Sequence, residues 1–266
     1  MTVFVFFIIS LSASVIGAVC GIGGGVIIKP CLDIFNLAGI ATISFLSSST
    51  VLAMTTYSVA RTLISRDGHL NMKIATPLAA GAALGGVLGQ ELFRMLRAFF
   101  AGSDRIGAVQ AVCLGIMTLG TLVYTVKKKS IPTHQVKNAG VCILIGFLLG
   151  LVSSFLGIGG GPMNLVVLYY FFSMDTKSAV HTSLYLIFFS QLMNILSTVV
   201  TGTVPDFDPL VLVTMIAGGI GGGIIGRGLH KRIRAEAVER LFIGLMAVII
   251  GISVYNAIQY SGLFGG

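Results

Sequence analysis

Long apolar runs separated by short polar connections constrain this sequence more than any other feature. Eight such runs follow one another along 266 residues. Most approach the length of about 20 residues that an α-helix needs to cross a membrane. Charged residues make up 10% of the chain, against about 25% in soluble domains, and are too few to cover a water-facing surface. The pattern excludes a cytosolic globular enzyme, a disordered protein and a secreted disulfide scaffold, and predicts an all-α polytopic membrane protein.

A glycine-rich break interrupts the first and the fifth apolar run. Gly21-Ile22-Gly23-Gly24-Gly25 recurs in the second half of the chain as Gly157-Ile158-Gly159-Gly160-Gly161, which Pro162 follows. After each break come a shorter apolar run, a run rich in serine and threonine, a glycine-rich run and a plainer run. A glycine motif duplicated in matching context indicates an internal duplication of the chain.

The duplication divides the chain into two repeats and a linker. In the first repeat, residues 1–126, we predict a broken segment at about 3–35 and spans at about 40–64, 74–92 and 106–126. Residues 127–137 form a polar linker. In the second repeat, residues 138–260, we predict a broken segment at about 138–172 and spans at about 178–200, 209–226 and 240–260.

The distribution of lysine and arginine residues distinguishes between two topologies. If each broken segment crosses the membrane, the repeats are parallel and lysine and arginine divide almost evenly between the two sides. If each is a re-entrant hairpin, the repeats are inverted and the charges divide 13 to 4, with Lys29, Arg94, Arg97 and Arg105 on the poorer side. Because basic residues gather on the cytoplasmic side, we predict inverted repeats, each with a hairpin and three transmembrane helices. The linker is then cytoplasmic and both termini lie outside.

The two breaks are the first candidate substrate site. Consecutive glycines destabilise a helix, and broken backbone is tolerated in a membrane only where protein or a wet cavity surrounds it. Symmetric breaks in two repeats point to a substrate site near the midplane, and the exposed N–H groups of a half-helix favour an anion. The alternative is a tight hairpin without a ligand. The candidate residues are Gly21, Gly23, Gly24, Gly25, Gly157, Gly159, Gly160 and Gly161.

Polar stripes on two predicted spans are the second candidate site. Ser44, Ser47, Ser48, Thr55 and Ser58 share one broad face of span 40–64, and Ser183, Ser190, Asn194 and Ser197 recur at helical spacing on span 178–200. Neutral donors on facing helices can bind an oxyanion, whereas the alternative is hydrogen bonding between the helices. The candidate binding residues are Ser47, Ser48, Thr182, Ser183, Gln191 and Asn194.

Other motifs have simpler interpretations. Gly81, Gly85 and Gly89, and likewise Gly218, Gly222 and Gly226, repeat every four residues and predict small-residue ridges for close helix packing. His181 is interpreted as a helix-end polar group and Cys20 as a packed small residue. No acidic residue lies clearly within a span, and the cysteines and histidines show no metal-ligand spacing.

The duplicated break resembles that of the TauE/SafE sulfite exporters, and the resemblance covers essentially the whole chain. Thr182-Ser183 looks like the Thr-Ser pair that follows the second motif in that family, whereas Leu46-Ser47 departs from it in the first repeat. The resemblance implies transport of a sulfur-containing anion such as sulfite or an organosulfonate. We therefore expect a secondary transporter that exports such an anion by alternating access. The alternatives are a transporter of another small organic anion and an intramembrane enzyme that uses His181 and Ser183.

The expected setting follows from the same reasoning. We expect a multi-pass protein of the cell inner membrane that is not an enzyme and uses no cofactor or metal. Its partners would be the anion and membrane lipid, with a homodimer left open. Nucleic acid is not expected, because the basic residues behind the net charge of +8 sit in short clusters between apolar runs.

Overall fold

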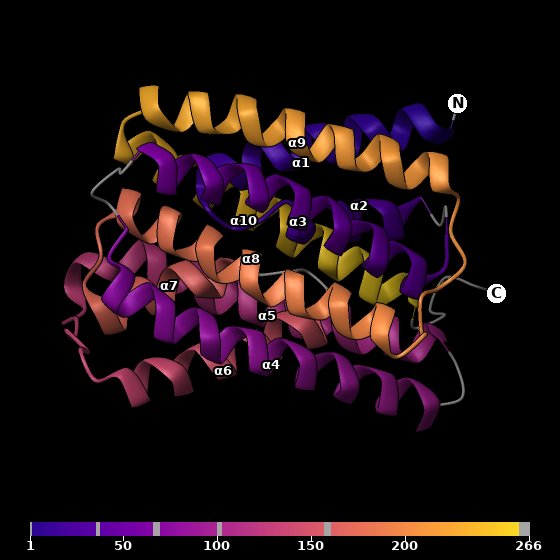
Figure 1. Cartoon of the computed structure of the whole chain (residues 1–266), viewed down its shortest axis with the longest axis horizontal. Coiled ribbons are helices and arrows are strands. Elements are labelled where there is room, and N and C mark those ends of the chain that lie inside the picture. The colour runs from indigo at the N-terminus through magenta and orange to yellow at the C-terminus, as the bar shows by residue number, and fades with distance from the viewer. Residues whose placement is uncertain (1, 36–37, 66–69, 100–102, 157–160, 261–266) are drawn as a thin grey trace.

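The chain is a bundle of long α-helices (Figure 1). The computed structural model describes residues 2–35, 38–65, 70–99, 103–156 and 161–260. Ten α-helices and one 3-10 turn cover most of this part, and no strand occurs in it. The helices are α1 (Thr2–Cys20), α2 (Gly25–Ile34), α3 (Ile40–Ser65), α4 (Met72–Phe99), α5 (Ser103–Lys127), α6 (Ala139–Phe155), α7 (Pro162–Phe172), α8 (Thr176–Val200), α9 (Pro209–Arg232) and α10 (Ala235–Tyr260).

Polar and proline residues fix where several helices begin. The side chain of Asn138 accepts hydrogen bonds from the first amides of α6, and Asp175 and Asp208 cap α8 and α9 in the same way. Such caps pair amides that have no partner within the helix. Pro162 occupies the first turn of α7, where its missing N–H costs nothing.

Seven of the described helices are long and apolar enough to cross a membrane: α1, α3, α4, α5, α8, α9 and α10. Large apolar side chains such as Leu84, Ile116 and Val213 are exposed, while many serine, threonine, asparagine and glutamine side chains are buried. This distribution suits a surface that faces lipid. The prediction of an all-α polytopic membrane protein is confirmed.

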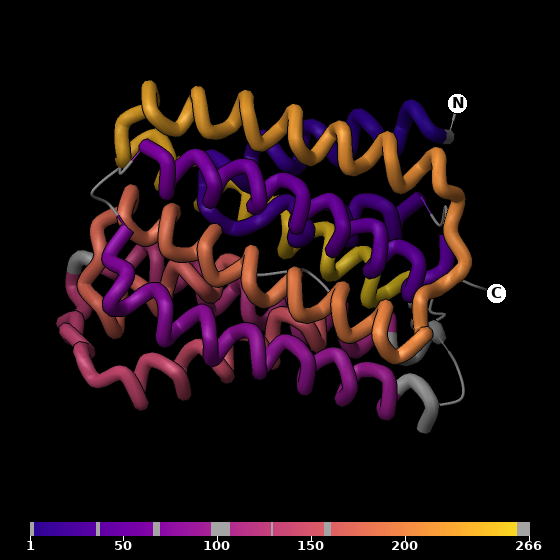
Figure 2. The backbone as a smooth tube through the Cα atoms, viewed as in Figure 1, coloured from indigo at the N-terminus to yellow at the C-terminus, as the bar shows by residue number. Residues whose placement is uncertain are grey.

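The helices run between two ends of the bundle. Figure 1 shows that α1 begins and α10 ends at one end, here named the terminal end, whereas the connection from α5 to α6 lies at the opposite, linker end. α2 runs back beside α1, as Figure 2 shows. A Cβ on Gly24, which precedes α2, would lie 3.2 Å from the backbone of Ala13 in the middle of α1. The first broken segment is thus a helical hairpin.

Helices of the two predicted repeats pack in a reciprocal pattern. α1 lies along α9, and its counterpart α6 lies along α4. α3 contacts both α8 and α9, while α8 contacts both α3 and α4, and α5 pairs with α10. A two-fold relation between the repeats would produce this pattern. The inverted repeats and their boundaries stay a prediction.

The glycine ridges make the closest of these contacts. A Cβ on Gly81, Gly85 or Gly89 of α4 would overlap backbone carbonyls of α6. On α9, a Cβ on Gly222 would lie 2.7 Å from the carbonyl oxygen of Leu11, and one on Gly226 would lie 2.5 Å from that of Val15. The backbones approach only because these residues have no side chain. The packing role predicted for the two ridges is confirmed.

Candidate substrate site

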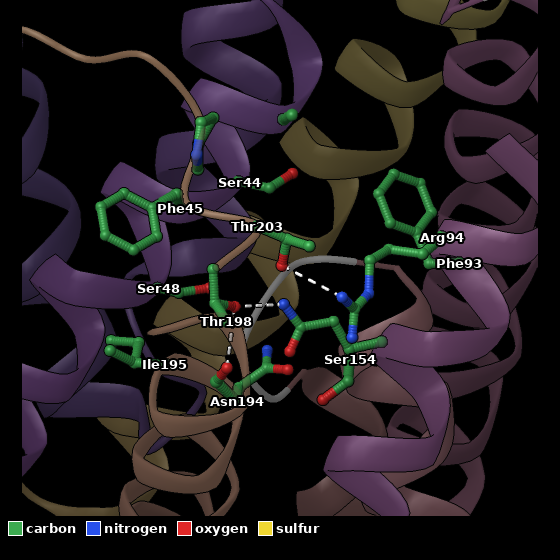
Figure 3. Close-up of a pocket in the computed structure, with 13 residues that line it drawn as sticks. Ser44, Phe45, Ser48, Phe93, Arg94, Ser154, Asn194, Ile195, Thr198 and Thr203 are labelled. Carbon is green, nitrogen blue, oxygen red and sulfur yellow. Dashed lines mark hydrogen bonds between the residues drawn. The ribbon is translucent and has the colours of Figure 1, made fainter. Parts of the chain in front are cut away.

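A cavity of about 480 Å³ lies at the terminal end of the bundle (Figure 3). It lies between the first half of α3 and the last turns of α4 and α8, with one side chain from α6 and part of the connection that follows α8. Its polar lining residues are Ser44, Ser48, Gln90, Arg94, Ser154, Asn194, Thr198 and Thr203. Its apolar lining residues are Ala41, Phe45, Phe93, Ile195 and Pro205. We name it the terminal-end cavity.

A hydrogen-bonded pair joins α4 to α8 at this cavity. The Gln90 side-chain amide donates to the hydroxyl of Thr198. That hydroxyl in turn donates to the carbonyl of Asn194 one turn earlier, at 2.9 Å. These bonds hold Gln90 and Thr198 beside the cavity and leave the Asn194 side chain directed into it (Figure 3).

Arg94 supplies the positive charge of the cavity rim. One guanidinium nitrogen donates to the hydroxyls of Thr201 and Thr203, at 3.0 and 3.1 Å, and the other forms an ion pair with Glu91. None of the described residues that line the cavity is acidic. The rim therefore combines a positioned guanidinium with hydroxyl and amide groups, a set of donors suited to an anion.

Several buried polar atoms around the cavity have no hydrogen-bond partner among the described residues. Those of lining residues are Ser44 Oγ, Gln90 Oε1, Arg94 Nε, Ser154 Oγ and Asn194 Oδ1, and those of Ser190 and Gln191 lie nearby on α8. Buried polar groups in proteins are almost always paired. Unpaired hydroxyl and amide groups beside a cavity are therefore able to bind a small polar ligand.

The predicted stripe residues divide between the cavity and the helix interface. Ser48 and Asn194 line the cavity. Ser47 and Gln191 are buried outside its lining. Thr182 and Ser183 are also buried, but they lie in the first turns of α8, toward the linker end. The cavity therefore gathers part of the second candidate site.

The first glycine break lies against helices and outside the cavity lining. Gly21 and Gly23 have φ of 75° and 69°, a conformation that favours glycine, and the Gly21 amide donates to the carbonyl of Gly17. A Cβ on Gly21 would lie 2.7 Å from the Cα of Val180. Gly24 and Gly25 are buried where α2 begins. The backbone of this break therefore packs closely against helices α1 and α8.

The second break is described only at its end. Gly157, Gly159 and Gly160 lie outside the described residues. Gly161 is extended, precedes the first turn of α7, and lines a small cavity of about 20 Å³ together with Ser153 and Asn164. That space is far smaller than the terminal-end cavity.

Five polar lining residues were predicted neither as binding residues nor as members of a polar stripe: Gln90, Arg94, Ser154, Thr198 and Thr203. Thr198 follows Asn194 by one helical turn, so the stripe on α8 could have included it. Gln90 directly follows the ridge glycine Gly89 and precedes Glu91, near the end of the span predicted at about 74–92. Ser154 stands shortly before Leu156, and nothing in the sequence distinguishes it.

The histidine of the enzyme alternative lies elsewhere. The Nδ1 atom of His181 lies 3.3 Å from the Thr62 hydroxyl at the linker end, and its ring contacts that of His230. Among the described residues, no group of three histidine, cysteine, aspartate or glutamate side chains is placed to hold a metal ion.

Comparisons with known proteins agree with this architecture. Residues 6–254 match the family model described as sulfite exporter TauE/SafE. A relative from Bacillus subtilis (strain 168), named probable membrane transporter protein YunE, is 23% identical over 299 residues, which cover 99% of this chain and 100% of the relative. No protein of solved structure matches the chain.

Proposed function

Because the chain belongs to the TauE/SafE sulfite exporter family, a family of membrane transporters, we propose that it exports a small sulfur-containing anion such as sulfite or an organosulfonate. In this proposal it works as a secondary transporter by alternating access. The terminal-end cavity is the substrate site in one of its two conformations.

The observation that carries the proposal is the chemistry of the terminal-end cavity. Hydroxyl and amide groups from four helices, α3, α4, α6 and α8, surround it, Arg94 stands at its rim, and none of the described lining residues is acidic. Serine, threonine and asparagine donors can hold an oxyanion without the cost of a second buried charge. A substrate cation would meet the guanidinium without a lining carboxylate to balance it.

The apolar part of the lining favours an organosulfonate over bare sulfite. Phe45, Phe93 and Ile195 lie beside the polar residues in Figure 3. An organic substrate could place its sulfonate against the donors and its carbon chain against these side chains. Another small organic anion, with a carboxylate in place of the sulfonate, fits the same arrangement and remains the second candidate.

The one-sided cavity supports alternating access. The cavity lies at the terminal end, whereas toward the linker end α3 and α9 are joined through the buried Thr62 and Arg227. Transporters built from inverted repeats expose one site to each side in turn. With the linker end in the cytoplasm, as the positive charges favour, this conformation faces outward and both termini lie outside. A potential of about 100 mV, inside negative, then contributes about 2.3 kcal/mol per charge to the export of an anion.

A flux assay in liposomes tests the proposal. Purified protein should give saturable flux of sulfite, sulfoacetate or thiosulfate that other anions inhibit and amines do not, with sulfate and lactate included as competitors. Replacement Asn194→Ala should raise the half-saturating concentration about two- to twelvefold, which corresponds to the loss of one hydrogen bond of about 0.5–1.5 kcal/mol.

The matched control is Ser197→Ala, which changes a half-buried residue of the same helix that does not line the cavity. The half-saturating concentration of the anion for Ser197→Ala should equal that for the wild type. Saturable flux of a cation without dependence on anions would contradict the proposal. Equal effects of the two variants would place the substrate outside the terminal-end cavity.

A further inference from the structure

Two hydrogen-bonded pairs occupy corresponding positions in the predicted repeats. The spacing that relates Gly81, Gly85 and Gly89 of the ridge on α4 to Gly218, Gly222 and Gly226 of the ridge on α9 also relates Gln90 to Arg227. On α3 and α8, the spacing between the two glycine breaks relates Thr62 to Thr198. The pair of Gln90 and Thr198 therefore corresponds to the pair of Arg227 and Thr62.

The contacts of the two pairs agree with this correspondence. Gln90 donates to the Thr198 hydroxyl, and Arg227 Nη1 donates to the Thr62 hydroxyl at 2.6 Å. Each threonine hydroxyl also donates to the carbonyl one helical turn earlier, at 2.9 Å in both cases. The first pair joins α4 to α8 beside the terminal-end cavity, and the second joins α9 to α3 toward the linker end.

The two pairs differ in charge and in packing. Gln90 is neutral and lines the cavity, whereas Arg227 is charged and 8% exposed. Arg227 also donates to the carbonyl of Ser58 and to the hydroxyl of Ser65, both at 3.1 Å. In this conformation hydroxyl and carbonyl oxygens of α3 therefore occupy positions around the guanidinium that an oxyanion could take.

We propose that Arg227 and Thr62 form a second anion site, which becomes the mouth of the substrate cavity when the protein opens at the linker end. This inference rests on the proposed function. When the protein closes at the terminal end and opens at the linker end, α9 separates from α3 at the linker end. The Arg227 guanidinium then donates to oxygens of the anion in place of the oxygens of α3. A guanidinium binds a sulfonate or sulfite with two parallel hydrogen bonds, which a glutamine amide cannot reproduce.

A second position on α4 and α9 also bears on the charge of the two mouths. Lys231 follows Arg227 at the spacing by which Arg94 follows Gln90, so each mouth has a second cation one turn further along the helix. The linker-end mouth then carries the cations Arg227 and Lys231, whereas the terminal-end mouth carries the neutral Gln90 and the cation Arg94. An anion is therefore bound more tightly at the linker end and released more readily at the terminal end. Export needs this difference, because the linker end faces the cytoplasm in the proposed topology.

Exchanging the two side chains tests the inference. Anion flux is measured in membrane vesicles of both orientations, with sulfite and sulfoacetate as probes. An epitope inserted between residues 131 and 137 reports which end faces the bath. Arg227→Gln should raise the half-saturating concentration about tenfold when the linker end faces the anion, and change it less than about twofold at the terminal end. Gln90→Arg should lower it about tenfold at the terminal end alone.

Two further variants control for stability and for surface charge. Arg227→Lys keeps the charge and should recover part of the linker-end affinity, and it replaces Arg227→Gln in the test if that variant does not fold. Arg232→Gln removes an exposed charge from the same helix and should leave both values within about twofold of the wild type.

The outcomes separate this inference from the proposed function. Absence of saturable anion flux in the wild type would contradict both the proposed function and the second anion site. Flux in the wild type together with equal effects of Arg227→Gln at both ends, or no effect at either, overturns the second site alone.

Discussion

The two glycine-broken segments, α1–α2 and α6–α7, share a glycine motif but are fixed by different side chains. The carbonyl of Val19, near the end of α1, faces Nδ1 of His230 at 2.8 Å. Phe155 holds the corresponding position before the second break, and its carbonyl accepts a hydrogen bond of 2.7 Å from the side chain of Gln110. The next carbonyl, of Leu156, accepts one of 2.9 Å from Lys29. The end of α1 is thus capped by a histidine of α9, and the end of α6 by a glutamine of α5 and a lysine of α2.

The difference shows what a broken helix needs from the rest of the protein. Each helix end leaves carbonyls without partners, and a break inside a membrane protein has little water to supply them. Lys29 is 4% exposed and also donates to Gln110 at 2.6 Å, so the second break is tied to both α2 and α5. The position that corresponds to Lys29 in the second repeat is Leu165, which cannot donate. Compared with the second break, the first break depends more on the backbone conformation of its own glycines and on helix packing.

The largest effect is expected at Gly21, where the first break depends on backbone conformation. Gly21→Ala forces a side chain into a left-handed conformation, at about 1–2 kcal/mol, and into contact with Val180, at about 1–3 kcal/mol. We expect a loss of about 2–5 kcal/mol, the sum of these two costs, measured as a lower unfolding temperature and a smaller folded fraction in detergent.

The control for this prediction is Gly120→Ala. Gly120 lies in α5 with open space where a Cβ would stand, so its replacement should not lower stability. Equal stability of Gly21→Ala and Gly120→Ala would mean that the first break does not depend on its glycine.

A smaller effect is expected at Lys29, which fixes the second break. Lys29→Met keeps most of the side-chain volume and removes the donors to Leu156 and Gln110. Bonds from a charged donor contribute about 1.5–3 kcal/mol, and we expect a loss of that size in chemical unfolding. Leu165→Met, at the corresponding position, should change stability by less than about 1.5 kcal/mol. If the two variants unfold alike, the two breaks are not held differently.

The helices of this fold could be predicted from the sequence because apolar length alone specifies them. The predicted spans agree least with the structure at their ends. The span predicted to end at 92 continues as α4 to Phe99, and the span predicted to end at 226 continues as α9 to Arg232. Charged residues such as Arg94 and Arg227 end the apolar run but are good helix formers, so the helix continues beyond the membrane-like segment.

The candidate site could be predicted only where its residues share one helix. Ser48 and Asn194 lie on polar stripes, and periodicity within α3 and α8 indicated both. Gln90 and Ser154 reach the cavity because the glycine ridge of α4 brings α4 and α6 together. That juxtaposition depends on contacts between distant segments, and no pattern within one helix encodes it.

The smallest effect is expected at His230, which caps the first hairpin. His230→Phe keeps an aromatic ring against His181 and removes the nitrogen that faces the Val19 carbonyl. One neutral hydrogen bond contributes about 0.5–1.5 kcal/mol, so the loss should be smaller than that of Lys29→Met. The double variant sharpens the comparison, because residues that cap different breaks should have additive effects within about 0.5 kcal/mol if the two sites are independent. Chemical unfolding of the two single variants and the double variant in one detergent measures this. A departure of more than about 1 kcal/mol would mean that the two breaks are coupled through the helices between them. The two breaks would then belong to one cooperative unit, and their different caps would be two parts of a single restraint.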